Sequence, residues 1–143
     1  MDDQTFLAQF EARTWPLDQW HHRQHVKVAY LYLCRYPLDT AIQKMCSGVR
    51  AYNAAHNVPE SLEGGYHETM TQAWMRLVYL TFREYGASES ADAFVDKHTQ
   101  LLSKRALLFF YSRDHIMSAD AKCRFVHPDL TPFPRSRKDE DAA

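Results

Sequence analysis

Two short stretches of the sequence combine residue types that bind metal ions or exchange protons. WHHRQHV places His22 and His25 three residues apart, and YHET places His67, Glu68 and Thr69 in a row, each where an apolar segment begins. On a helix, residues three apart have Cβ atoms about 5–6 Å from each other, so two imidazoles can share one metal ion. The spacing makes His22, His25 and His67 candidate ligands of a divalent metal ion such as Fe(II) or Zn(II).

The sequence around the first motif turns its histidines towards the protein interior. With a helical repeat of about 100° per residue, His22 and His25 share a side with Ala29 and Leu33, whereas Arg23 falls on the opposite side. Two imidazoles on the apolar face of a helix are expected to lie in or near the core.

The second motif begins with His67, on the same side of its helix as Trp74. A helix N-terminus disfavours a protonated imidazole, so His67 is expected to be neutral, the form that coordinates metals or accepts a proton. Glu68 and Thr69 follow in the first turn and are the candidate catalytic residues. Glu68, or alternatively Glu11, is a candidate fourth ligand or general base.

These histidines support more than one interpretation. They can be unrelated core residues, each hydrogen-bonded to a backbone carbonyl. Three inward imidazoles at two helix starts favour a shared polar pocket, because each buried ring needs a polar partner. We therefore predict an enzyme that uses Fe or Zn to act on a small molecule, although the HExxH helix of zinc proteases is absent. A metal-free small-molecule-binding protein and a structural or accessory protein are the alternatives.

The elements that position these residues are all predicted to be helices, because helical periodicity recurs along the chain and no alternating strand pattern is present. The expected main helices cover residues 3–13, 17–35, 39–56, 67–85, and a fifth from Ser88 or Ser90 to 104. Gly86 is expected to end the fourth helix, and Ser118 to cap a short C-terminal helix. The fold class is therefore all-α: one helical domain over residues 1–133, followed by a disordered charged tail over 134–143. The apolar run ALLFFY, residues 106–111, is ambiguous between helix and strand.

Several other residues are assigned to the core or to the surface. Cys34 and Cys46 lie within apolar helical patterns and are predicted to be core residues. His98, His115 and His127 follow no common face and are predicted to be surface or loop residues.

Composition limits the classes of partner. The 143-residue chain has a formal net charge of −1, so it lacks the basic excess that a nucleic-acid-binding protein needs. No apolar run approaches membrane-spanning length, and the start MDDQ is acidic where a signal peptide is basic. Three widely spaced cysteines without a CxxC pair indicate reduced thiols and a cytoplasmic location. The expected partner is a small molecule, and the oligomeric state is not indicated.

The two motifs together resemble a family of small bacterial proteins of unknown function. That family typically reads Trp-Thr-His-x-x-His-Leu early and Tyr-His-Glu-Thr-x-Thr later, with a tryptophan three to four positions on. The matching residues here are Trp20, His22, His25, Tyr66, His67, Glu68, Thr69, Thr71 and Trp74, and the resemblance extends to about Tyr85 and weakly over 112–132. His21 departs from the pattern, which has serine or threonine there. The resemblance implies that the two motifs form one site, and it implies no activity.

Overall fold

The computed structural model describes residues 1–135, and the regular elements of this part of the chain are all helices, without a strand. The predicted all-α fold class is confirmed. The α-helices are α1 (Asp3–Glu11), α2 (His22–Arg35), α3 (Leu38–Ala55), α4 (Glu68–Tyr85), α5 (Ala91–Lys97), α6 (Arg113–Ile116) and α7 (Ala119–Cys123). The 3-10 helices are η1 (Leu17–Gln19), η2 (Thr99–Leu102) and η3 (Lys104–Phe109). The tail predicted to be disordered covers residues 134–143, and its part from residue 136 onward lies outside the described residues.

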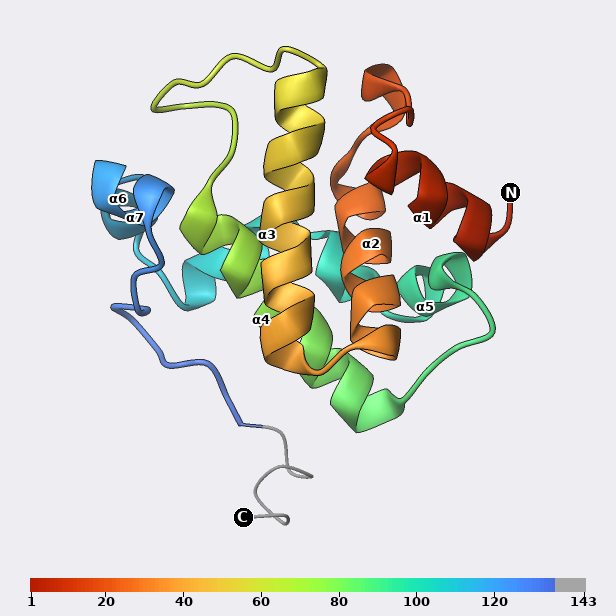
Figure 1. Ribbon diagram of the computed structural model, residues 1–143. Coiled ribbons are helices and arrows are strands. Elements are labelled where there is room, and N and C mark those ends of the chain that lie inside the picture. Colours follow the sequence, from red (N-terminus) through yellow and green to blue (C-terminus); the bar gives the residue numbers. More distant parts are fainter. Residues whose placement is uncertain (136–143) are drawn as a thin grey trace.

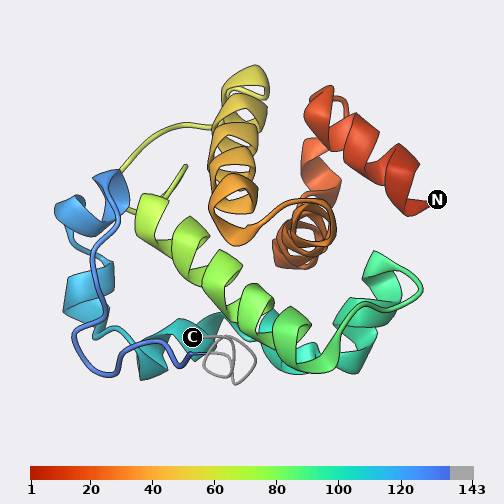
Figure 2. The ribbon, with the colours of Figure 1, turned by 60° about the horizontal axis from the view of Figure 1, so that its bottom comes forward.

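Helix α2 lies at the centre of the bundle and packs against α3, α4 and α5 (Figure 1). In Figure 2, where α2 is seen nearly end-on, α4 runs across α2 and α3, while α1 and α5 lie on the other side of α2. The large buried side chains of this core come from all five of these helices: Phe6, Phe10, Val26, Val28, Tyr52, Met75, Val78 and Phe94. The apolar stripes predicted from helical periodicity thus meet around α2.

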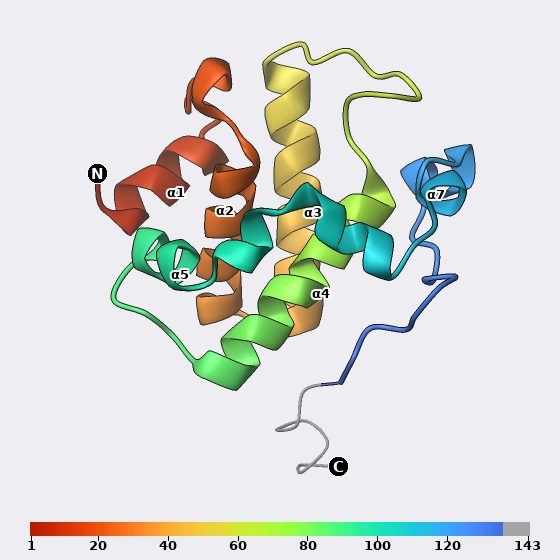
Figure 3. The same ribbon diagram turned by 180° about the vertical axis from the view of Figure 1, so that it is seen from behind.

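The segment after η2 forms a smaller core of its own against α4. Tyr111, Ile116, Ala121 and Val126 are buried together with Ala73 of α4. The Tyr111 hydroxyl donates a hydrogen bond to the Val126 carbonyl at 2.7 Å, which ties the segment after η3 to the chain beyond α7. Figure 3, which views the molecule from behind, shows η3 in front of α3 and the first half of α4.

Two helix boundaries near the N-terminus differ from the prediction. The helix expected from Leu17 is interrupted: η1 ends at Gln19, and His21 is extended, with its N–H bonded to the Gln24 side chain at 3.0 Å. This bond satisfies a backbone donor at the start of α2, so the helix begins at His22. Helix α1 ends at Glu11 rather than at Arg13, because Arg13 adopts a positive φ of 64°.

The fifth helix is shorter than predicted. Ser90 caps it as expected, accepting a hydrogen bond from the Ala93 N–H at 3.0 Å, but it ends at Lys97. His98 then leaves helical geometry, and its ring packs against those of Phe94 and Tyr85, with centroids 4.7 and 5.0 Å away. His98, predicted to be a surface or loop residue, does lie in the connection between α5 and η2, but these aromatic contacts leave it only 9% exposed, so it is not a surface residue.

Other expectations have mixed outcomes. Gly86 ends α4 with a φ of 79°, and Ser118 caps α7, as predicted. Cys46 is buried as predicted, but Cys34 is exposed in the last turn of α2, beyond the core. All three cysteines are free. Within residues 1–135, no helix is both long and apolar enough to cross a membrane.

Candidate functional site

A cavity of about 720 Å³ lies between α2, α3 and α4 on one side and η3 and α6 on the other. Its floor is apolar and buried, and is built from Val26, Ala29, Met45, Val49, Met75 and Val78 of the three long helices. His22, His25 and His67 all line the cavity, so the two motifs predicted to face inward do face one space.

The loop before α4 closes one side of this space, with Gly65 and Tyr66 in the cavity wall. Lys122 of α7 holds the loop in place. Its ammonium group donates to the carbonyl oxygens of Tyr66 and Gly64, and it pairs with Glu60 at 3.2 Å. The C-terminal helices therefore fix the position of a cavity wall that lies far away in the sequence.

His22, in the first turn of α2, is anchored by the segment that follows α5. Its Nε2 lies 2.9 Å from the Leu101 carbonyl oxygen, and because a carbonyl only accepts, Nε2 carries the proton and donates. The ring also meets the edge of Trp74, with centroids 4.4 Å apart. Burial lowers the pKa of His22, so the ring is neutral at pH 7.

His25 lies one turn further along α2, and its ring packs on Trp20 with centroids 4.2 Å apart. No side chain or backbone group among residues 1–135 is hydrogen-bonded to this ring. Burial, together with smaller contributions from the nearby His22 and Lys104, lowers the pKa of His25 to about 3. His25 is therefore a neutral imidazole on the cavity wall whose hydrogen-bonding capacity is not used by the described chain.

His67 does not open α4 as its first residue but caps it. Its Nδ1 accepts the Met70 N–H at 3.0 Å, and its Nε2 donates to the Ile116 carbonyl at 2.8 Å. Burial lowers its pKa, which agrees with the neutral form predicted for a helix N-terminus. Both ring nitrogens are occupied, so a metal ion can bind His67 only if one of these bonds breaks.

Glu68 is not among the residues that line the cavity. Its carboxylate accepts from Tyr66 at 2.7 Å, from Gln72 at 2.6 Å and from Cys46 at 3.5 Å, and it pairs with Arg50 at 3.2 Å. Burial raises the pKa of Glu68, but these hydrogen bonds and the Arg50 charge outweigh burial and the net shift is downward. Glu68 is an ionised carboxylate at the centre of a closed network.

The thiol in this network is not activated. Burial raises the pKa of Cys46 to about 11, and the adjacent Glu68 carboxylate adds to the shift. A thiol is nucleophilic as the thiolate, which is scarce at pH 7 when the pKa is high. The cluster around Glu68 therefore has the properties of a structural network that joins α3 to α4.

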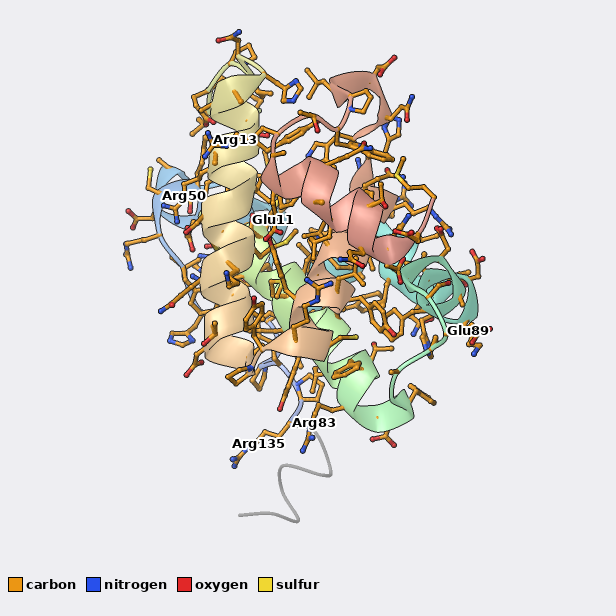
Figure 4. The ribbon with its side chains drawn as sticks, turned by 45° about the vertical axis from the view of Figure 1, so that its right-hand side comes forward. Glu11, Arg13, Arg50, Arg83, Glu89 and Arg135 are labelled. Carbon is orange, nitrogen blue, oxygen red and sulfur yellow. The ribbon has the colours of Figure 1, made fainter. Side chains whose placement is uncertain are left out.

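Thr69, the other candidate catalytic residue, is fully buried and also lies off the cavity. Its hydroxyl donates to the Arg124 carbonyl at 2.8 Å and accepts the Val126 N–H at 3.1 Å. Glu11, the alternative acid, lies at the end of α1 between that helix and α3 (Figure 4), where its carboxylate accepts from the Tyr32 hydroxyl at 2.9 Å. None of these three oxygen-bearing side chains faces the predicted ligands.

The three histidines predicted as metal ligands differ in how many of their ring nitrogens are already hydrogen-bonded. Within residues 1–135, no three His, Cys, Asp or Glu side chains are placed to hold one metal ion. His67 already uses both ring nitrogens, and His22 uses one. Catalytic zinc sites use about three protein ligands and an open position, so a metal site shared by these histidines would require His67 to release one of its two hydrogen bonds.

The cavity also has lining residues that the sequence analysis did not single out. Lys104 and Arg105 of η3 and Arg113 of α6 line it, together with the apolar Leu108 and Met117. The available signal was KRALLFF, a basic pair directly before an apolar run. Periodicity did not assign this run to an element, so its position against the histidines was not predictable.

No protein family, curated protein or solved structure matches this chain. The resemblance of the two histidine motifs to a bacterial family of unknown function stays a prediction.

Proposed function

We propose that the cavity binds a small, largely apolar molecule, and the observation that supports this most strongly is the cavity itself. Its volume of about 720 Å³ falls within the roughly 300–1,000 Å³ common for small-molecule sites. The floor is built on three long helices, which hold apolar side chains at the surface of an open space. A ligand that covers this surface removes it from water, which is favourable in proportion to the area covered.

The two histidines of α2 supply the polar contacts that orient a ligand in such a site. A neutral imidazole offers one donor and one acceptor, and the His25 ring uses neither within the described chain. His22 donates to Leu101 and keeps Nδ1 as an acceptor. The site therefore combines an apolar floor with a few directed polar groups, which favours binding without metal chemistry.

A neutral fluorescent probe tests this function directly. N-Phenyl-1-naphthylamine, whose emission rises in apolar surroundings, is expected to bind saturably with one molecule per chain. Asn53→Trp places a large ring in the cavity wall and should weaken binding at least about tenfold through steric exclusion. Gln43→Trp adds the same ring to an exposed position of α3 and should leave binding unchanged. Binding that does not saturate, or equal loss in both variants, contradicts the proposal.

The metal-dependent enzyme predicted from the sequence is the second candidate. Its support is the shared location of His22, His25 and His67 on one cavity. Protein purified without a His tag and incubated with Fe(II) or Zn(II) distinguishes the two functions by elemental analysis. Stoichiometric metal that is lost in His25→Ala would favour the enzyme, whereas metal-free protein that still binds the probe would favour the binding function.

A further inference from the structure

The cavity has a one-sided distribution of charge. Its lining includes the side chains of Lys104, Arg105 and Arg113, and it includes no aspartate or glutamate. The whole chain carries a formal net charge of −1, so this basic character is local. An anion inside the cavity would meet three cationic groups and no carboxylate of the described lining.

These three cations also differ from several basic residues elsewhere in the molecule, which are paired with carboxylates. Arg23 and Lys122, for example, pair with carboxylates at 2.9 and 3.2 Å. Within residues 1–135, no carboxylate forms an ion pair with Lys104, Arg105 or Arg113. Their charges are not neutralised by a described partner and remain available to a bound ligand.

The positive charge of Lys104, a residue of the cavity lining, also affects the two histidines of α2. Burial is the main cause of the lowered pKa of both His22 and His25, and the positive charge of Lys104 is a smaller cause in both cases. Lys104 therefore lies close enough to the two histidines to affect them electrostatically. A ligand that contacts the histidines reaches the field of Lys104.

The cavity changes in polarity from its floor to its mouth. The floor residues of α2, α3 and α4 are at most 3% exposed. The cationic residues are exposed, and so are three apolar lining residues, Leu17 at 43%, Leu108 at 38% and Met117 at 38%. The exposed part of the lining, called the rim here, therefore combines apolar side chains with cations, whereas the floor is apolar and buried.

We propose that the ligand of this cavity is an amphipathic organic anion, with its apolar body on the floor and a carboxylate or similar singly charged acid group at the rim, held by Lys104 and Arg105. This inference rests on the proposed binding function and names the ligand class. Charge-assisted hydrogen bonds from ammonium and guanidinium groups to an acid group are stronger than neutral ones. An uncharged molecule of the same shape gains the floor contacts but not these bonds.

Two probes that share one apolar body separate the contribution of the charge from that of the floor. 8-Anilinonaphthalene-1-sulfonate is N-phenyl-1-naphthylamine with one added sulfonate, so their dissociation constants report the effect of the anionic group. At about pH 8, where ordinary imidazoles are neutral, and low ionic strength, the anionic probe is expected to bind about tenfold tighter or more. The preference should shrink as salt is added, because exposed charges are screened.

Paired variants assign this preference to the rim. Lys104→Gln with Arg105→Gln should reduce the ratio of the two dissociation constants towards one, while the neutral probe keeps its affinity. Arg35→Gln with Lys44→Gln removes the same charge away from the cavity and should leave the ratio unchanged. Far-ultraviolet circular dichroism and the melting temperature establish that both double variants fold.

Each result decides between the two proposals. If the neutral probe binds saturably but the anionic probe binds no tighter, the anion proposal is overturned and the binding function stands. Equal loss of preference in the two double variants also overturns it, because the effect is then one of overall charge. If neither probe binds saturably, both proposals fail.

Discussion

The starts of α2 and α4 look alike in the sequence and differ in the structure. Both carry inward histidines at a helix N-terminus, and all three rings line one cavity. At α4, His67 bonds to Met70 and Ile116 through both ring nitrogens. At α2, His25 has no hydrogen bond among the described residues and packs on Trp20. The same residue type thus fastens the chain at His67, whereas at His25 it faces the cavity without a hydrogen bond to the described chain.

The difference shows which part of the site is structural and which part is available to a ligand. A buried polar group with all its bonds made contributes to stability, and removing it leaves its partners unpaired. A polar group open to a cavity can bind a ligand because its bonds to protein are not made. The comparison predicts that substitutions at the start of α4 lower stability, and that those at the start of α2 affect binding and pH dependence.

The largest effect is expected for Thr69→Val, which keeps the shape of the side chain and removes its hydroxyl. The Arg124 carbonyl and the Val126 N–H would lose their shared buried partner, so unfolding free energy should fall by roughly 2–4 kcal/mol. Thr81→Val is the control, because its hydroxyl only bonds to the Leu77 carbonyl within the helix, and it should cost less than about 0.5 kcal/mol. Urea denaturation measures both, and a loss for Thr69→Val as small as that for Thr81→Val would contradict the structural role.

Protonation of His25 is expected to lower the unfolding free energy by a smaller amount. Its pKa is about 3 in the folded state, against an ordinary value near 6.5. The unfolded chain therefore binds a proton at His25 more readily than the folded protein does. As a result, protonation of His25 does not reduce the unfolding free energy above about pH 6.5, and it reduces it progressively as the pH falls from there towards 3. Between pH 7.5 and 5.5 the loss attributable to His25 is on the order of 1 kcal/mol.

The variant His25→Phe isolates this contribution, because it keeps the packing on Trp20 and removes the titration. The unfolding free energy of His25→Phe should depend less on pH than that of the unmodified protein, although His22 and His67 still titrate with lowered pKa values. At pH 7.5 the two proteins should differ by less than about 1 kcal/mol, since no hydrogen bond is removed. Parallel curves of stability against pH would show that His25 is not the buried neutral group described here.

The cap at α4 is expected to contribute about 1 kcal/mol. His67→Ala removes the acceptor of the Met70 N–H and the donor to Ile116, so stability should fall by roughly 1–2 kcal/mol. His67→Asn restores a good capping group but does not reach Ile116, and it should recover about half of the loss. If asparagine recovers nothing, the cap is not the main role of His67.

The sequence was sufficient to predict the features that depend on neighbouring residues. Helix α3 was placed to within one residue at each end, and Ser90, Ser118 and Gly86 were identified as helix ends, because caps act over three or four positions. The inward direction of the histidines also followed from periodicity. These predictions required only the helical repeat and local hydrogen-bonding chemistry.

The remaining features depend on partners that are distant in the sequence. His22 is fixed by Leu101, 79 residues away, and His67 by Ile116, 49 residues away. The Arg50 side chain that helps to hold Glu68 comes from α3, 18 residues earlier. No periodicity argument locates such contacts, because they are set by how η2, η3 and α6 pack on the long helices. This is why Glu68 was predicted to face the site and instead lies in a network beside it.

The smallest effect is expected for Glu68→Gln on the affinity for the two naphthalene probes. Glu68 is absent from the cavity wall, so the affinity for the neutral and the anionic naphthalene probes should change by less than about twofold, even though the variant is less stable. The amide keeps the size of the side chain but replaces the charge that Arg50 faces, and one of its two ends becomes a donor directed at the donors Tyr66 and Gln72. Stability should therefore fall while binding by the folded fraction is retained.

If Glu68 were instead a metal ligand or a general base of the cavity, Glu68→Gln would alter metal content or turnover without a comparable loss of stability. Probe titrations and elemental analysis on the same preparation distinguish these two outcomes, and a large change in probe affinity would remove the division between a structural α4 start and an open α2 start.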